Sequence, residues 1–372
     1  MKIAIPKEIK NNENRIAIVP GGVRQLVLDG HEVFVQKNGG MGIGITDEEY
    51  IKAGAKILNT LEECFATGEM IIKVKEPQPN EIALLKPHHI LYTYLHLAAD
   101  KPQTEGLMKS GATCIAYETI QLEDNSLPLL VPMSEVAGRM SVQVGASYLQ
   151  LDKGGKGILL GGVPGVHRAK VTIIGCGIAG TNAAQMAVGM GADVTLIDLS
   201  TKRLAELDQL FENKVNTIFS NAANIEEAVV NSDLVIGAVL VPGAKAPKLV
   251  TREMISKMQK GSVVVDIAVD QGGCIETCKP TTHENPTFMV DGVVHYCVAN
   301  MPGAVARTST FALTNVTLRY ARALAGMGVD KAIMKDKALR LGVNIYKGKL
   351  VYEQVARDLD LPYTPLSLDK YL

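Results

Sequence analysis

A glycine-rich turn between residues 171 and 198 constrains the fold of this chain more than any other segment. The apolar run Val171-Thr172-Ile173-Ile174 predicts a buried strand, and Gly175-Cys176-Gly177-Ile178-Ala179-Gly180 follows it with the spacing GxGxxG. A helical pattern then covers residues 181–189, and a second apolar run ends at Asp198. These glycines, followed about 20 residues later by an acidic residue, predict a βαβ unit that binds a dinucleotide.

Each residue of this motif has a physical role in that interpretation. Gly175 permits the tight turn, Gly177 lets the backbone approach a pyrophosphate, and Gly180 lets the helix pack closely on the strand. The exposed N–H groups and the positive end of the helix dipole favour phosphate. Asp198 can accept hydrogen bonds from both ribose hydroxyls and would repel a 2′-phosphate, which favours NAD over NADP, although the nearby Arg203 weakens that preference slightly. The alternative is a structural turn without a ligand.

Short β-rich runs alternate with helical patterns along most of the chain. The predicted strands cover residues 2–6, 32–36, 70–74, 90–94, 113–117, 170–174, 193–197, 216–219, 234–238 and 263–267. Helices are predicted between them, including one at 47–53 with Asp47 as its N-cap. This alternation is typical of parallel βαβ units, and the continuous apolar runs fit strands that are buried on both faces.

The order of these patterns predicts an α/β protein with two Rossmann-like doubly wound domains, mostly parallel sheets and a cleft between them. A long helix over 132–150 and a glycine-rich passage over 154–165 lead into the nucleotide motif. From residue 308 to 361 the pattern is helical, with no sheet of its own to cover. We therefore expect a substrate domain of residues 1–130 plus 307–372, with an NAD-binding domain, 131–306, inserted into it. The cleft is the natural active site.

Composition excludes several other classes of protein. The 372 residues are 47% apolar, with a formal net charge of −1, so no basic face predicts nucleic-acid binding. No apolar run approaches the ~18 residues of a membrane span, and the N-terminus lacks a signal-peptide pattern, so we expect a cytoplasmic protein without membrane contact. The six cysteines are too sparse for a disulfide framework, and Cys274 and Cys278 lack the partners of a zinc site. Reduced thiols and no metal are expected.

Four charged side chains stand out as candidates for a substrate site. Lys75 ends the predicted strand 70–74, His96 follows the strand 90–94, and Asp270 follows the strand 263–267. Ligands of open α/β sheets bind beyond the carboxyl ends of strands. Arg15 lies in a loop context of the first domain. Position alone leaves structural roles open for all four. The glycine-rich run 39–44 does not fit GxGxxG and is interpreted as a tight loop.

Three motifs together carry a resemblance to a known family. They are Ile5-Pro6-Lys7-Glu8, then Asn12-Glu13 with Arg15-Ile16-Ala17, and Gly161-Gly162-Val163-Pro164-Gly165-Val166 before the GxGxxG turn. With these motifs the chain resembles the alanine dehydrogenase and transhydrogenase family over essentially its whole length. It departs at Val19, where the family usually has Ser or Thr, and at Cys176, where it usually has Gly or Ala.

The resemblance implies an NAD-dependent, reversible oxidative deamination of L-alanine to pyruvate and ammonium, and a homohexamer. It implies that Arg15 and Lys75 bind the substrate carboxylate and that His96 and Asp270 are catalytic. Further positions contact the cofactor in this reading: Ser134, Ile178, Ala179, Asp198, Arg203, Ser220, Val239, Leu240, Ile267, Ala268, Val269, Asp270, Val298, Ala299, Asn300 and Met301.

Three other functions stay open at this stage. The first is the soluble NAD(H)-binding part of a proton-translocating transhydrogenase, which passes on hydride and holds no amino acid. The second is a dehydrogenase for a larger amino acid such as saccharopine, and the third is a catalytically silent NAD-binding protein. His96, which the transhydrogenase part generally lacks, favours the alanine enzyme over the first, as does the absence of its Arg-Gln-Asp segment from residues 117–132.

Overall fold

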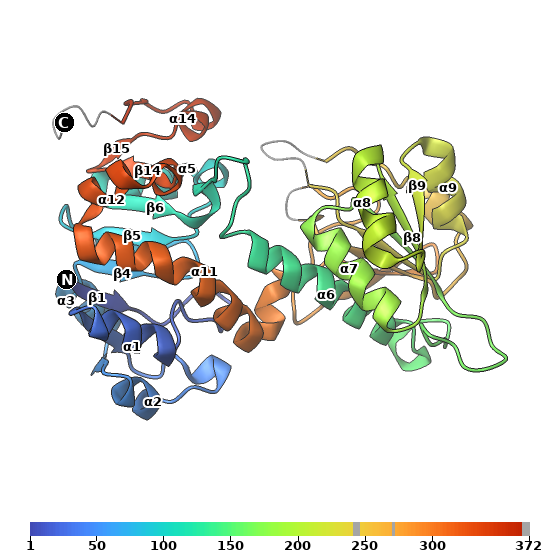
Figure 1. Cartoon of the computed structure of the whole chain (residues 1–372), viewed down its shortest axis with the longest axis horizontal. Helices are drawn as coiled ribbons and strands as arrows, with labels where there is room; N and C mark the ends of the chain where they lie inside the picture. The colour runs from blue at the N-terminus through green and yellow to red at the C-terminus, as the bar shows by residue number, and fades with distance from the viewer. Residues whose placement is uncertain (241–245, 270–271, 367–372) are drawn as a thin grey trace. The chain divides into compact units, whose positions relative to one another are not determined.

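The computed structural model describes residues 1–240, 246–269 and 272–366 of a chain that divides into two compact units (Figure 1). The first unit comprises Met1–Met133 and Val305–Leu372, and the second comprises Ser134–Ala304. Each unit is built on one mostly parallel sheet with helices. The predicted α/β class with two Rossmann-like domains is therefore confirmed.

The sheet of the first unit has eight strands within the described residues, in the order β15-β14-β6-β5-β4-β1-β2-β3. The strands β1 to β6 pair in parallel, whereas β14 and β15 are antiparallel additions at one edge. Their bounds are β1 Lys2–Ile5, β2 Glu32–Gln36, β3 Lys56–Leu58, β4 Met70–Ile72, β5 Ile90–Thr93, β6 Thr113–Ala116, β14 Val343–Tyr346 and β15 Lys349–Leu350.

Helices cover both faces of this sheet. Ile3 and Ile5 of β1 belong to one core with Leu313 of α11, while Ala4 between them belongs to a second core with Phe65 of α3. Burial on both faces explains why the strands read as continuous apolar runs. The helices are α1 Pro20–Leu28, α2 Asp47–Lys52, α3 Leu61–Thr67, α4 Pro79–Ile82, α5 Lys101–Ser110, α11 Ala306–Met327, α12 Val329–Lys335, α13 Lys337–Leu341 and α14 Glu353–Leu359.

The described part of the second unit has a seven-stranded sheet in the order β12-β13-β11-β10-β7-β8-β9. Its pairs are parallel except for β12 with β13. The strands are β7 Lys170–Ile174, β8 Asp193–Asp198, β9 Val215–Phe219, β10 Leu234–Gly237, β11 Val263–Asp266, β12 Thr287–Val290 and β13 Val293–Tyr296. The helices are α6 Val131–Tyr148, α7 Ile178–Gly189, α8 Thr201–Phe211, α9 Ala222–Val230 and α10 Arg252–Lys257.

Both sheets contain the same doubly wound core. The order is β3-β2-β1-β4-β5-β6 in the first unit and β9-β8-β7-β10-β11-β13 in the second. The winding direction reverses between β1 and β4, and again between β7 and β10. Ligands of such sheets bind beyond the carboxyl ends of the strands at this reversal. Each unit therefore offers one place where a ligand site is expected.

Two local expectations from the sequence are wrong. Residues 308–361 are not helical throughout, because β14 and β15 interrupt them and β14 pairs with β6, whose outer edge would otherwise expose unpaired backbone groups. The N-cap of α2 is Thr46 and not Asp47. Thr46 Oγ1 accepts the Glu49 N–H at 3.3 Å while the Glu49 carboxylate accepts the Thr46 N–H at 2.8 Å, which is a capping box.

Candidate active site

The glycine turn of the second unit joins β7 to α7 at the reversal point. Gly175 has a φ of 89°, in the left-handed region that favours glycine. A Cβ added to Gly180 would overlap the carbonyl oxygen of Gly175, so only glycine lets α7 start this close to the strand. A Cβ on Gly177 would meet no atom within 4 Å. The turn is thus packed on its inner side and open at Gly177, where a pyrophosphate would approach.

Asp198 ends β8 beside this turn, as the motif predicts. Its carboxylate accepts the backbone N–H of Cys176 at 2.8 Å and that of Ser200 at 2.9 Å. Because each carboxylate oxygen has a second lone pair, Asp198 can still accept from ribose hydroxyls. Arg203 holds the other side of the turn, since its Nε donates to the Cys176 carbonyl at 2.9 Å and its Nη2 donates to Thr181 Oγ1 at 2.8 Å.

The other predicted cofactor positions lie at the carboxyl ends of neighbouring strands or at the starts of helices. Ser220 follows β9 and donates its N–H to the Asp198 carbonyl at 3.0 Å. Ser134 lies near the start of α6, and Ile178 and Ala179 begin α7. The remaining described positions follow β10, β11 and β13: Val239, Leu240, Ile267, Ala268, Val269, Val298, Ala299, Asn300 and Met301. Asp270 lies outside the described residues.

Helix α6 contacts the start of the nucleotide-binding helix directly. A Cβ added to Gly138 of α6 would overlap the backbone carbonyl of Ala179. The next residue of α6, Arg139, donates from Nε to Oδ1 of Asn182, about one turn further along α7, at 2.9 Å. The position of α7, and with it the direction of its N-terminal N–H groups, therefore depends on a glycine in α6 that the sequence motif does not include.

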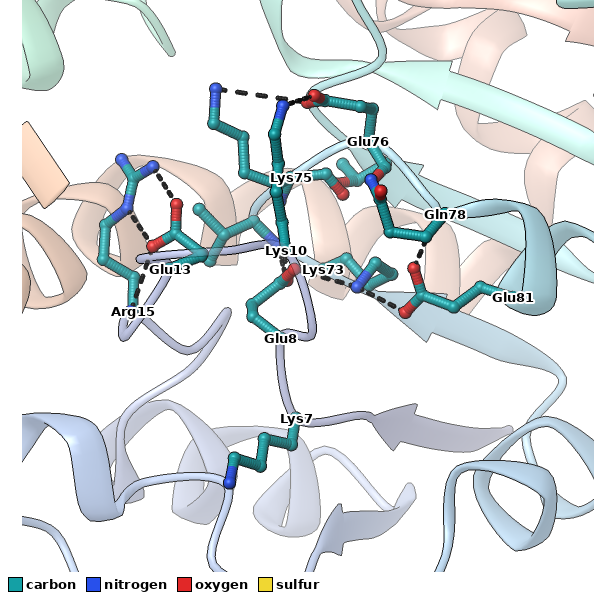
Figure 2. Close-up of polar contacts among 12 residues, drawn as sticks. Lys7, Glu8, Lys10, Glu13, Arg15, Lys73, Lys75, Glu76, Gln78 and Glu81 are labelled. Atoms are coloured by element: carbon teal, nitrogen blue, oxygen red, sulfur yellow. Dashed lines mark hydrogen bonds and ion pairs between the residues drawn. The ribbon is translucent and has the colours of Figure 1, made fainter. Parts of the chain in front are cut away.

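Arg15 lies beyond the carboxyl end of β1 in the first unit and is buried, at 2% exposure. Its Nε and Nη2 donate to the two carboxylate oxygens of Glu13 at 2.7 and 2.6 Å (Figure 2). Burial opposes ionisation of Glu13, but the hydrogen bonds and charge of Arg15 outweigh it and lower the pKa of Glu13. Arg15 is thus a fully charged group that is oriented by a neighbouring carboxylate.

Lys75 lies beyond the end of β4, the strand next to β1. Its Nζ is 4.0 Å from Glu76 Oε2, which is too long for a hydrogen bond. Burial is the largest cause that lowers the pKa of Lys75, and the positive charges of Arg15 and Lys10 add to it. The negative charge of Glu76 raises the pKa but does not outweigh them. The charge of Arg15 therefore acts on Lys75 at the reversal point of the first sheet.

Three buried charges lie beneath these residues, and the sequence interpretation missed them. Lys73 has no exposed surface, and its Nζ lies 2.9 Å from Glu8 Oε2 and 2.7 Å from Glu81 Oε1 (Figure 2). Burial lowers the pKa of Lys73, but the two carboxylates outweigh burial and raise it. One signal was available, because a lysine at the end of a predicted buried strand needs a carboxylate partner.

His96 follows β5 by three residues and has a φ of 51°, in the left-handed region. Its backbone N–H donates to Glu118 Oε1 at 2.6 Å, and the N–H of Leu95 donates to the same oxygen at 3.1 Å. The imidazole is exposed and stacks on the Tyr94 ring with a centroid distance of 5.8 Å and an angle of 12°. The Glu118 carboxylate thus holds the backbone of residues 95 and 96 while the ring of His96 stays accessible to a ligand.

The described residues also bear on membrane spans, metal sites and disulfides. Within the residues that the structure describes, no helix is long and apolar enough to cross a membrane. No group of three His, Cys, Asp or Glu side chains gathers there with the geometry of a metal site. All six cysteines are free thiols.

The second unit combines a doubly wound sheet with a GxGxxG turn and an acidic strand end, and the first unit is also doubly wound. These features are typical of two-domain proteins of the dinucleotide-binding class. The family models "Alanine dehydrogenase/PNT, N-terminal domain" and "Alanine dehydrogenase/PNT, C-terminal domain" match residues 4–137 and 141–353. The chain belongs to the alanine dehydrogenase/PNT family, as the sequence motifs predicted.

Individual relatives cover nearly the whole chain. The chain is 60% identical to the alanine dehydrogenase of Methanococcus maripaludis and 58% identical to that of Geobacillus stearothermophilus, each over 98% of both chains. A solved L-alanine dehydrogenase structure has a TM-score of 0.95 and 51% identity, over 97% of this chain and 99% of that one. A transhydrogenase from Sinorhizobium meliloti has a TM-score of 0.81 and 25% identity, over 95% and 99%.

Proposed function

We propose that this chain catalyses the NAD-dependent, reversible oxidative deamination of L-alanine to pyruvate and ammonium. The observation that carries the proposal is the pair of cations, Arg15 and Lys75, at the reversal point of the first sheet. Such a pair suits a small carboxylate ligand. The high identity to relatives named alanine dehydrogenase, over almost their full lengths, supports the same function.

NAD is the proposed cofactor of the second unit. The open side of Gly177 and the acceptor oxygens of Asp198 suit a pyrophosphate and an unphosphorylated ribose. When bound, NAD accepts the hydride that leaves Cα of alanine. Ser134, Ser220 and the positions after β10, β11 and β13 are proposed as further cofactor contacts.

The proposed task of Arg15 and Lys75 is to bind the carboxylate of alanine or pyruvate. Their positive charges also disfavour the cationic form of the substrate amine and so assist its deprotonation. Lys75 is only partly exposed, so its attraction for the carboxylate is screened less than that of a surface lysine.

His96 is the proposed group that takes the proton from the substrate amine. A neutral imidazole is suited to proton transfer near neutral pH, and the ring of His96 is exposed while its backbone is held by Glu118. After oxidation, water attacks the iminium carbon and the resulting carbinolamine collapses to pyruvate and ammonium. Asp270 stays a predicted catalytic residue for that stage.

Formation of NADH by the purified chain with a panel of amino acids tests the proposal. L-alanine with NAD should give rapid turnover, with glycine, L-serine and saccharopine much slower. Turnover of saccharopine alone would identify a dehydrogenase for a larger amino acid. NADH binding without turnover of any amino acid would instead support a hydride-relay subunit or a silent binding protein. The homohexamer implied by the family and the cytoplasmic location expected from the sequence stay predictions, and sedimentation of the purified chain tests the first.

A further inference from the structure

Two chain segments leave the first sheet side by side at its reversal point. One follows β1 and carries Glu8, Lys10 and Arg15, and the other follows β4 and carries Lys73 and Lys75. The two proposed carboxylate-binding cations therefore come from different segments. The relative position of Arg15 and Lys75 therefore depends on the contacts between these segments beyond the last paired residues of β1 and β4, Ala4 and Ile71.

Glu8 makes the buried connection between these segments. Its Oε2 lies 2.9 Å from Lys73 Nζ, and its Oε1 accepts the backbone N–H of Val74 at 2.6 Å and, more weakly, that of Lys75 at 3.4 Å. One carboxylate thus contacts three consecutive residues that end at Lys75. Figure 2 shows Lys73 between the carboxylates of Glu8 and Glu81.

A second ion pair joins the same segments nearer the surface. Lys10 donates to Glu76 Oε1, and Glu76 Oε2 faces Lys75 at 4.0 Å (Figure 2). Lys10 is partly exposed, whereas Glu8 and Lys73 are buried. Buried charges contribute little net stability compared with apolar side chains of the same volume, but they can impose one geometry. Because these buried charges lie next to the proposed binding pair, we ask whether they fix the positions of Arg15 and Lys75.

We propose that Glu8 is a positioning residue that, through Lys73 and the Val74–Lys75 backbone, sets the spacing of the carboxylate-binding pair Arg15 and Lys75. This inference rests on the proposed function of that pair. The Lys10–Glu76 ion pair is a second, more exposed connection between the same two segments. Neither Glu8 nor Lys10 contacts substrate in this role.

Steady-state kinetics of Glu8→Gln tests the proposal. Glutamine keeps the shape but turns a neutral amide toward the ammonium of Lys73, so the two segments should separate. The KM values for L-alanine and pyruvate should both rise by about tenfold or more, because small misplacements of binding groups are costly. The KM for NAD should stay within about twofold and kcat within about threefold, the pattern of lost substrate binding.

Matched variants separate positioning from loss of stability. Lys7→Gln is the control, because Lys7 neighbours Glu8 in sequence but is exposed and points away from the cluster (Figure 2). Glu81→Gln removes the other carboxylate of Lys73 without touching the backbone of Lys75. It should lower the thermal midpoint as much as Glu8→Gln, with a several-fold smaller change in the KM for alanine. Equal KM changes in these two variants would overturn the proposal.

Lys10→Gln keeps the test decisive if Glu8→Gln does not fold. Lys10 is partly exposed, so this variant should fold normally and raise the KM for alanine by a few-fold with an unchanged KM for NAD. An unchanged KM for alanine in Lys10→Gln and Glu8→Gln, or equal changes in the KM values for alanine and NAD, would refute the positioning role. Absence of alanine-dependent NADH formation by the unmodified chain would instead refute the proposed function.

Discussion

The carboxylate of Glu118 accepts the backbone N–H of His96 at 2.6 Å, and His96 adopts a left-handed conformation with a φ of 51°. That conformation is unfavourable for a residue with a side chain. The contact with Glu118 therefore offsets a local cost, and it is made by the backbone of His96 and not by its ring. Strain of this kind concentrates at functional sites.

Replacing His96 by alanine should lower kcat by about 10²–10⁴-fold, the usual contribution of a general acid–base group. The backbone contact to Glu118 survives the change, so the loop and NADH binding should be preserved. Turnover and NADH fluorescence titration measure the two effects. His88→Ala is a matched control, because His88 is an exposed histidine before β5. Retention of most of the kcat by His96→Ala would remove His96 from the catalytic group.

Arg15→Ala should raise the KM for alanine and also destabilise the first unit. The substitution leaves the Glu13 carboxylate buried without its guanidinium partner. Loss of one partner of a buried pair costs about 3–5 kcal/mol, measurable by urea unfolding. In Glu13→Gln/Arg15→Ala, stability should partly recover while the KM for alanine stays high. Recovery of both would mean that Arg15 has a structural role only.

Asp198→Ala should reduce the preference for NAD over NADP. The carboxylate is both a ribose acceptor and a repulsive charge against a 2′-phosphate. The ratio of kcat/KM values for the two cofactors should fall by at least about tenfold, since juxtaposed like charges cost several kcal/mol. Asp198→Asn keeps an acceptor oxygen and should lose less of the NAD activity. A preference that survives both changes would assign the selectivity elsewhere.

Gly138→Ala should weaken NAD binding although no cofactor role is proposed for residue 138. The new methyl group would overlap the carbonyl of Ala179 and push α6 away from the start of α7. Overpacking costs about 1–3 kcal/mol, so NADH affinity should fall by about tenfold. Gly145→Ala on the same helix is the control, because the atoms nearest to its methyl group belong to the buried Leu234 side chain of β10 and not to α7. Equal losses of NADH affinity in both variants would contradict this reading.

We expect the protein to lose stability in mild acid because His89 is buried. Burial lowers the pKa of His89 to about 4, and its Nδ1 accepts the Lys86 N–H at 2.8 Å while Nε2 faces the Phe65 carbonyl at 2.9 Å. Between pH 6.5 and about 4 the unfolded chain binds a proton that the folded chain resists. The free energy of unfolding should therefore fall by up to about 3 kcal/mol as pH decreases through this window.

Urea unfolding at pH 7.5 and pH 5 measures this effect. His89→Gln, whose amide can keep one acceptor and one donor in place, should show a smaller difference between the two pH values. His88→Gln keeps the burial of His89 but removes a neighbouring charge that also lowers the pKa of His89, so it should keep most of the difference. An unchanged pH dependence in His89→Gln would assign the acid sensitivity to another group.

Local patterns in the sequence were sufficient for most of the elements. The strand runs, the GxGxxG turn and Asp198 are short-range signals, because a βαβ unit brings its own residues together over a few tens of positions. The structure confirms the α/β class, and α7 begins at Ile178, directly after the last residue of the open turn. The family was also recognisable from motifs whose residues are contiguous.

Only the tertiary structure determines which charged side chains form ion pairs and hydrogen bonds. Glu8 and Lys73 are 65 residues apart, and they pair because β1 and β4 become neighbours where the winding reverses. The carboxylate of Glu118 lies 22 residues from the His96 backbone that it holds. The strand β14 likewise exists because β6 offers it an unpaired edge. Amphipathic period and turn chemistry act between near neighbours in sequence, whereas burial and ion pairing act between neighbours in space, which only the order of the strands determines.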